Sequence, residues 1–146
     1  MTKQFSEKDA KSKIISIFSK APQTTLGIEK ILSLNHDEGR ALVLYNAGQH
    51  MCHSGNIVQG GFITGWLDAS MALACMAKAG ADVLVLSLEI KTSFINVTTI
   101  GKVYAEGWVY KIGKNIGFLE GELKNEDGKI LAKGSQTVKL KPNFYK

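Results

Sequence analysis

The sequence contains little cysteine and little proline, and it lacks a long uninterrupted apolar run. Its 146 residues include two Cys and two Pro. Two thiols are too few for a disulfide framework, and a chain of this length buries enough surface to fold without one. With 45% hydrophobic and 21% charged residues, disordered and collagen-like classes are excluded as well. We therefore expect a single domain over residues 1–146.

No segment has the composition of a secretion signal or of a membrane span. The first twenty residues mix acidic with basic side chains and contain no apolar core, so we expect a cytoplasmic protein. The apolar stretch from Phe62 to Ala77 is shorter than the ~20 residues that a transmembrane helix needs. Asp68 near its centre would cost about 2.5–3.5 kcal/mol on insertion scales. The sequence therefore predicts no membrane contact.

The formal net charge of +5, from 18 Lys and Arg against 13 Asp and Glu, favours anionic partners. The lysines are dispersed through strand-like segments, which suits a phosphate-bearing small molecule as well as nucleic acid. For most of them, solubility of polar strand faces is the better explanation. Nucleic-acid recognition places aromatic side chains among basic ones on one sheet face. Here Trp108, Tyr110 and Phe118 are explained by ordinary strand alternation, so we expect no nucleic-acid partner.

The hydrophobic pattern changes its period along the chain. The first 22 residues predict an amphipathic N-terminal helix over Ser6 to Lys20. A polar, Gly-rich loop is expected from Ala47 to Val58, followed by an apolar helix from Gly61 to Ala79 that is buried on nearly every side. Elsewhere a period of two predicts strands. The predicted strands are Gly27–Leu34, Arg40–Asn46, Val83–Ile95, Gly101–Ile112, Asn115–Lys124 and Lys129–Leu140.

The order of these elements predicts an α+β fold. The last four strands follow one another, with hairpin-turn composition at residues 113–115 and 125–128, so we expect them to form an antiparallel meander. A doubly wound parallel sheet would need alternating helices and a Gly-rich phosphate loop, and the sequence contains neither. We expect a core over residues 27–140, in which six antiparallel strands wrap one long apolar helix.

One face of that predicted helix is small and carries a single acid. Gly61, Gly65, Asp68 and Ala72 lie within about a quarter turn of one another at 100° per residue. A buried carboxylate costs several kcal/mol unless it is paired. Two explanations of Asp68 remain open: a structural carboxylate bound by neighbouring backbone or hydroxyl groups, and a catalytic one.

Gln59-Gly60-Gly61 stands where the helix begins. Backbone N–H groups at this position are unpaired within the helix and carry partial positive charge. They would stabilise a carbonyl oxygen that acquires negative charge, and removing one such donor costs about 2.7–4 kcal/mol in known enzymes. A Gly pair can also merely form a tight turn. Together with Asp68, however, the helix start predicts attack on an acyl carbonyl.

These residues resemble a known family. The stretch Gly55–Ile63, followed by Trp66-Leu67-Asp68, is similar to the signature of hotdog-fold acyl-CoA thioesterases of the PaaI-like type, which are related to 4-hydroxybenzoyl-CoA thioesterase. The resemblance runs from about residue 27 to residue 140. It implies the hotdog fold, and a homodimer or dimer of dimers with active sites between subunits. The later segments that carry it are Leu86–Ile90, Gly113–Phe118 and Lys129–Gly134.

The resemblance also implies roles for single residues. Asp68 of one chain would act as nucleophile or as general base for water, while the Gly60 and Gly61 amides of another chain polarise the thioester carbonyl. Ser87 corresponds to a residue that fixes the attacking water. The family reaction needs no metal and no separate cofactor, because coenzyme A is part of the substrate.

Substrate contacts are expected from two further places. His53 and Asn56 lie in the polar loop, and Gly113 with Lys114 at a predicted turn would meet the coenzyme A phosphates. Many relatives have His at position 59 and Asn at position 53, where this chain has Gln59 and His53. Glutamine donates a hydrogen bond but carries no proton near neutral pH. An alternative therefore remains: a non-catalytic hotdog module that binds acyl-CoA or acyl chains.

The run His50-Met51-Cys52-His53 resembles a fragment of a metal site. Zinc sites usually draw ligands from two separated segments, and no second Cys or His pair follows. We therefore expect no metal. A cysteine nucleophile at Cys52 or Cys75 lacks an adjacent base to activate it.

Overall fold

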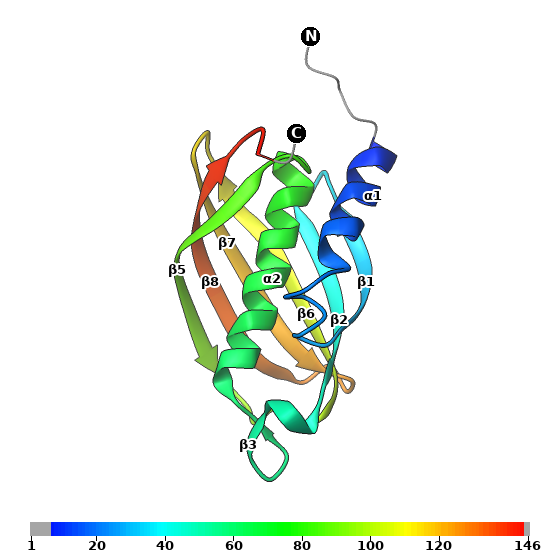
Figure 1. Cartoon of the computed structure of the whole chain (residues 1–146). Helices are drawn as coiled ribbons and strands as arrows, with labels where there is room; N and C mark the ends of the chain where they lie inside the picture. The colour runs from blue at the N-terminus through cyan, green and yellow to red at the C-terminus, as the bar shows by residue number, and fades with distance from the viewer. Residues whose placement is uncertain (1–6, 145–146) are drawn as a thin grey trace.

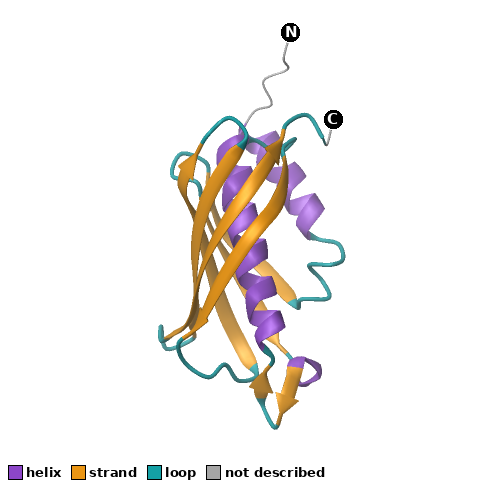
Figure 2. Cartoon of the chain, turned by 90° about the vertical axis from the view of Figure 1, so that its left-hand side faces the viewer, coloured by secondary structure: helices purple, strands orange, loops and turns teal. Residues whose placement is uncertain are grey.

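The computed structural model describes residues 7–144, and within them two α-helices lie on the same face of a six-stranded antiparallel sheet (Figures 1 and 2). A short two-stranded hairpin extends beyond the start of the longer helix. The elements are α1 (Glu7–Phe18), β1 (Ile28–Asn35), β2 (Arg40–Ala47), η1 (Gln49–Met51), β3 (Cys52–Ser54), β4 (Ile57–Val58), α2 (Gly60–Ala79), β5 (Leu84–Phe94), β6 (Gly101–Ile112), β7 (Ile116–Asn125) and β8 (Ile130–Lys141).

Helix α2 crosses the concave face of the sheet and forms the centre of the core (Figure 1). Trp66, Leu67, Met71 and Leu73 are fully buried. The Trp66 indole Nε1 donates a hydrogen bond to the Leu26 carbonyl at 2.7 Å, which fixes the segment between α1 and β1 against the helix. The predicted arrangement, one long helix wrapped by six antiparallel strands with an N-terminal helix, is confirmed.

Three glycines lie side by side across the sheet beneath α2. Gly107 of β6 pairs with Gly121 of β7, which pairs with Gly134 of β8. A Cβ atom on Gly107 would lie 2.5 Å from the Ser70 carbonyl oxygen and 2.6 Å from the Met71 Cα atom. Such distances are far below van der Waals contact. This glycine row, residues 107, 121 and 134, therefore lets the helix backbone approach the sheet more closely than any side chain would allow.

The strand order is β1-β2-β6-β7-β8-β5, so the predicted meander of the last four strands was wrong in one part. β6, β7 and β8 are consecutive neighbours, but β5 pairs with β8 at the edge. Helix α2 carries the chain from β2 to the opposite edge, and β6 then returns to pair with β2. The connection over residues 95–100 can span the ~14 Å of three strand spacings because six extended residues reach about 20 Å.

Strand β5 contains one extra residue. Its pairing with β8 shifts between Ser87 and Glu89, so that Leu88 is a β-bulge. Ser87 before the bulge and Thr92 after it both face α2, as their hydrogen bonds to helix residues show. Without the bulge, residues 87 and 92 would point to opposite faces.

Most of the predicted element boundaries agree with the structure to within two residues, although Ser6, where the N-terminal helix was expected to begin, lies outside the described residues. The expected hairpin turns are present: Asn125 Oδ1 accepts hydrogen bonds from the backbone N–H groups of Asp127 and Lys129, and Gly128 has φ +79°. The loop predicted over 47–58 was wrong in part, because it contains η1 and the β3–β4 hairpin.

In the part of the chain that the structure describes, no helix is long and apolar enough to span a membrane.

Candidate active site

Asp68 lies in the third turn of α2, at the side of the helix next to edge strand β5. The Ser87 hydroxyl donates a hydrogen bond to Asp68 Oδ1 at 3.0 Å. Four residues earlier along the same helix face, Thr64 Oγ1 donates to Thr92 Oγ1 at 3.0 Å. The carboxylate is half-buried rather than enclosed in apolar surroundings as the sequence predicted. The structure therefore brings two of the expected site residues, Asp68 and Ser87, into direct contact.

A third side chain, which was not predicted from the sequence, completes this cluster. The Gln136 amide of β8 donates from Nε2 to Asp68 Oδ1 and, at 2.6 Å, to Ser87 Oγ. Gln136 is 3% exposed. It shares the inward face of β8 with Val138 and Leu140, which are buried and apolar. A polar residue in that apolar row was the signal that could have revealed it.

The start of α2 presents unpaired donors. Among the described residues, the backbone N–H groups of Gly60 and Gly61 make no hydrogen bond, and the N-cap residue Gln59 makes no side-chain cap. Gly61 is exposed, and a Cβ there would meet no atom within 4 Å. The Phe94 ring covers Gly60, since a Cβ there would lie 3.0 Å from the Phe94 Cζ atom. The helix start is thus an open, positively polarised surface beside an aromatic side chain.

Within one chain the acid and these amides are separate. Asp68 comes eight residues after Gly60 in α2, which corresponds to about 12 Å along the helix axis. A single carbonyl group cannot contact both. The two halves of the predicted site therefore do not meet inside one copy of the chain.

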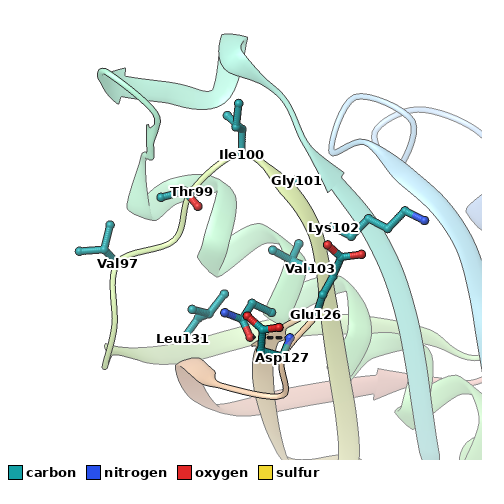
Figure 3. Close-up of a pocket in the computed structure, with 10 residues that line it drawn as sticks. Val97, Thr99, Ile100, Gly101, Lys102, Val103, Glu126, Asp127 and Leu131 are labelled. Carbon is teal, nitrogen blue, oxygen red and sulfur yellow. Dashed lines mark hydrogen bonds between the residues drawn. The ribbon is translucent and has the colours of Figure 1, made fainter.

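The polar loop residues His53 and Asn56 are exposed in and beside the β3–β4 hairpin, before the start of α2. His53 Nδ1 lies 2.8 Å from Ser54 Oγ. Next to this hairpin, where Ile57 pairs with Thr99, a hollow of about 200 Å³ opens between the β5–β6 connection and the β7–β8 turn (Figure 3). No sequence-predicted site residue lines it. Its lining residues are Val97, Thr99, Ile100, Gly101, Lys102, Val103, Asn125, Glu126, Asp127 and Leu131.

Gly113 and Lys114, expected to contact coenzyme A phosphates, lie in the β6–β7 turn. The neighbouring Gly117 lies against Cys75 in the last third of α2, whereas Gly60 is the first residue of that helix. One chain therefore does not bring this turn to the helix start.

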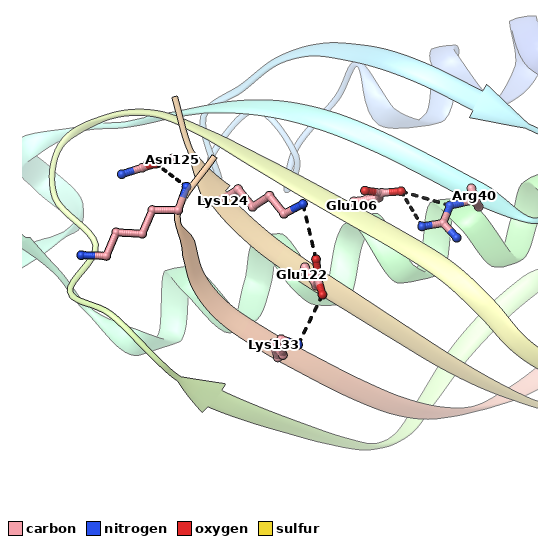
Figure 4. Close-up of polar contacts among 7 residues, drawn as sticks. Arg40, Glu106, Glu122, Lys124, Asn125 and Lys133 are labelled. Carbon is pink, nitrogen blue, oxygen red and sulfur yellow. Dashed lines mark hydrogen bonds and ion pairs between the residues drawn. The ribbon is translucent and has the colours of Figure 1, made fainter. Parts of the chain in front are cut away.

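The outer sheet face carries paired charges (Figure 4). Arg40 Nη2 donates a hydrogen bond to Glu106 Oε1 at 2.7 Å. Glu122 forms ion pairs with two lysines: its Oε2 atom lies 3.6 Å from Lys124 Nζ, and its Oε1 atom lies 3.5 Å from Lys133 Nζ. Since Glu106 and Glu122 are directly opposite on β6 and β7, these cations offset the repulsion between the two carboxylates.

The thiols and the His-rich run show no catalytic or metal-binding arrangement. Burial raises the pKa of the Cys75 thiol to about 12, which disfavours the reactive thiolate. Among residues 7–144, no group of three or more His, Cys, Asp or Glu side chains could hold a metal ion. Burial, and then the charge of Asp68, raise the pKa of the Tyr45 phenol above its usual range. Tyr45 therefore stays neutral beside the carboxylate.

The sequence matches the family model described as Thioesterase superfamily over residues 55–132, more than half of the chain. The chain belongs to the thioesterase superfamily. A Saccharolobus solfataricus protein named as an esterase is 30% identical over 120 residues, which cover 82% of this chain and 84% of that protein. The matched segment contains the helix start, Asp68 and Ser87, whereas Gln136 lies just beyond its end.

Solved structures of similar proteins share the fold. The Escherichia coli PaaI protein, from the phenylacetic acid degradation operon, has a TM-score of 0.81 at 21% identity, covering 92% of this chain and 94% of that one. A conserved protein of Pseudomonas aeruginosa has a TM-score of 0.78 at 27% identity, covering 90% of this chain and 99% of that one. The resemblance to PaaI-like hotdog thioesterases is confirmed, and the superfamily supports a hydrolase.

Proposed function

We propose that this protein hydrolyses an acyl-CoA thioester to a free acid and coenzyme A, with Asp68 as nucleophile or general base. The observation that carries this proposal is the state of the Asp68 carboxylate. Its Oδ1 atom accepts the Ser87 hydroxyl at 3.0 Å, whereas its Oδ2 atom has no partner among the described residues. A carboxylate that is oriented through one oxygen and free at the other is suited to attack or to proton abstraction.

Both forms of the reaction use the same groups. As nucleophile, Asp68 Oδ2 bonds to the thioester carbon, the coenzyme A thiolate leaves, and water hydrolyses the resulting anhydride. As general base, Asp68 takes a proton from water, whose oxygen bonds to the thioester carbon before the thiolate leaves. In either case negative charge develops on the carbonyl oxygen, and the unpaired Gly60 and Gly61 amides supply hydrogen bonds to it.

The proposal requires two copies of the chain, because the acid and the amides lie about 12 Å apart along one helix. Among the described residues, no strand pairs with the outer side of edge strand β5. Its Leu86, Leu88 and Phe94 side chains are 41%, 58% and 56% exposed. An exposed apolar edge strand is a site of association. We infer a homodimer, or a dimer of dimers, in which Asp68 of one subunit faces Gly60 and Gly61 of another.

Steady-state hydrolysis of a panel of aliphatic and aryl acyl-CoA thioesters tests the proposal. Asp68→Asn preserves shape but removes the attacking oxygen, so we expect kcat to fall by at least ~100-fold, the low end of measured losses for such groups. Asp82→Asn, the same chemical change beyond the end of α2, is the matched control and should retain wild-type kcat. Equal rates for wild type and Asp68→Asn would exclude Asp68 from the mechanism.

Position 59 favours a second candidate, an acyl-CoA-binding protein without turnover. Gln59 is the exposed N-cap residue of α2, and its side chain makes no capping hydrogen bond. Its amide carries no titratable proton. Calorimetry that shows tight acyl-CoA binding, with no thiol released over hours, would support this function. Turnover of any thioester in the panel would exclude it.

A further inference from the structure

Gln136 is the most buried side chain of the Asp68 cluster. Its side-chain hydrogen bonds go to Asp68 and to Ser87, which itself donates to Asp68. Its Nε2 atom carries two protons, and two acceptors receive them: Asp68 Oδ1 and Ser87 Oγ, the latter at 2.6 Å. Ser87 in turn donates its own proton to Asp68 Oδ1. The three side chains therefore form a closed triangle: two of their three donated protons go to Asp68 Oδ1, and the third goes to the hydroxyl that itself donates to Asp68 Oδ1.

The orientation of the Gln136 amide follows from this chemistry. The reverse orientation would place its carbonyl oxygen against an ionised carboxylate, which is repulsive. In the orientation observed, Oε1 is buried and has no partner among the described residues. A buried carbonyl without a hydrogen bond costs about 1–3 kcal/mol. Structural stability alone does not explain a buried glutamine here, because an apolar side chain of similar volume would avoid that cost.

The glycine row makes this contact possible. Gly134 precedes Gln136 by two residues on the same face of β8, and a Cβ there would lie 3.3 Å from the Leu67 side chain. Leu67 is the residue before Asp68. The close approach of α2 at this point places a side chain of β8, the strand next to edge strand β5, within reach of a carboxylate at the side of the helix.

We propose that Gln136 is a positioning residue that, with Ser87, occupies Oδ1 of Asp68 and so directs Oδ2 toward the substrate. The inference rests on the proposed function, since it gives Asp68 a reaction to perform. It assigns different tasks to the two oxygens: Oδ1 is the anchored atom, and Oδ2 is the atom that attacks or accepts the proton. Small displacements of such a group are costly, at about 100-fold for 1 Å.

Two variants test the role in catalysis. Gln136→Met keeps length and volume but removes both donors, so we expect kcat to fall about 10- to 100-fold while KM changes by less than about twofold. Its unfolding midpoint should equal or exceed that of wild type, because the buried carbonyl is gone. Gln23→Met is the matched control, since Gln23 Oε1 is also buried and unpartnered but lies between α1 and β1.

Gln136→Glu places a second carboxyl group beside Asp68. Like charges at this distance resist joint ionisation, so the rise of kcat with pH should move to higher pH than in wild type. Tyr45, the other titratable group that senses the charge of Asp68, stays neutral over this range. An unchanged profile would show that the side chain at position 136 does not contact Asp68, and would overturn the inference.

A measurement without turnover separates this inference from the proposed function. The side-chain amide protons of Gln136 are followed by NMR against pH, and their shifts should track ionisation of Asp68 and lose that dependence in Asp68→Asn. Absence of this response in wild type would overturn the inference whatever the activity. A wild-type response together with unchanged kcat in Gln136→Met would also overturn it, whereas equal activity of wild type and Asp68→Asn would instead refute the proposed function.

Discussion

Replacing Gly107 with Ala measures how much of the fold depends on close contact between α2 and the sheet. The added Cβ would lie 2.5 Å from the Ser70 carbonyl oxygen and 2.6 Å from the Met71 N and Cα atoms. Ordinary contacts of this kind are about 3.5 Å, so helix and strand must separate locally by about 1 Å. The obstructing atoms belong to the helix backbone, and no rotamer change can relieve the overlap.

The expected loss of stability is large. Overpacking of a core costs typically about 1–3 kcal/mol, and a clash with backbone belongs at the upper end, at about 3 kcal/mol. For a chain of this length the entropy of unfolding converts that loss into a fall in Tm of about 10 °C. Because the displaced segment adjoins Asp68, kcat should fall as well, even at temperatures where the variant is folded.

Urea and thermal unfolding of wild type, Gly107→Ala and Gly61→Ala provide the measurement. Gly61→Ala is the matched control, since its Cβ would meet nothing within 4 Å and alanine favours a helix over glycine by about 0.5–1 kcal/mol. The same substitution should therefore destabilise at position 107 and leave stability equal or higher at position 61. A Gly107→Ala protein within about 0.5 kcal/mol of wild type would refute the close-contact explanation.

Two further predictions concern thiols and assembly. Burial holds the pKa of Cys75 at about 12 against 9.0 for a free thiol. The unfolded chain therefore loses this proton first, so stability should fall between about pH 9 and 12. The loss should be smaller in Cys75→Ala, and the part that remains above about pH 10 is expected from Tyr45, whose pKa burial also raises from 10.0. At pH 8 the native protein should expose no more than one thiol to Ellman's reagent, and the unfolded protein two. Light scattering at micromolar concentration should give a dimer or tetramer, and a monomer would contradict the site shared between subunits.

The sequence predicted the elements well because their signals are local. The period of two in the C-terminal half and the turn composition around Asn125 and Gly128 identify strands and hairpins without reference to the rest of the chain. Strand order is different in kind. The pairing of β5 with β8 depends on the position at which α2 ends relative to the sheet. No residue in or near β5 indicates which strand will be its neighbour.

The candidate site likewise contains residues that local sequence patterns predict and one residue that they do not. Asp68 and the Gly60-Gly61 pair were predicted because an acid on an apolar helix and a Gly pair at its start are visible in one short stretch. Gln136 lies 68 residues from Asp68 along the chain, and their contact exists because the glycine row brings α2 and β8 together. Long-range contacts of this kind are created by packing, which a single sequence does not display.

The extra residue at Leu88 has a consequence for how this chain can vary in length. The bulge resets the alternation of β5, so that the hydroxyl at Ser87 and the row that includes Thr92 and Phe94 all face the helix. A homologue with one deletion here could keep its hydroxyl beside the acid or its aromatic ring over the helix start, but it could not keep both. The presence of one extra residue at position 88 therefore determines both whether a hydroxyl lies beside Asp68 and whether an aromatic ring lies over Gly60.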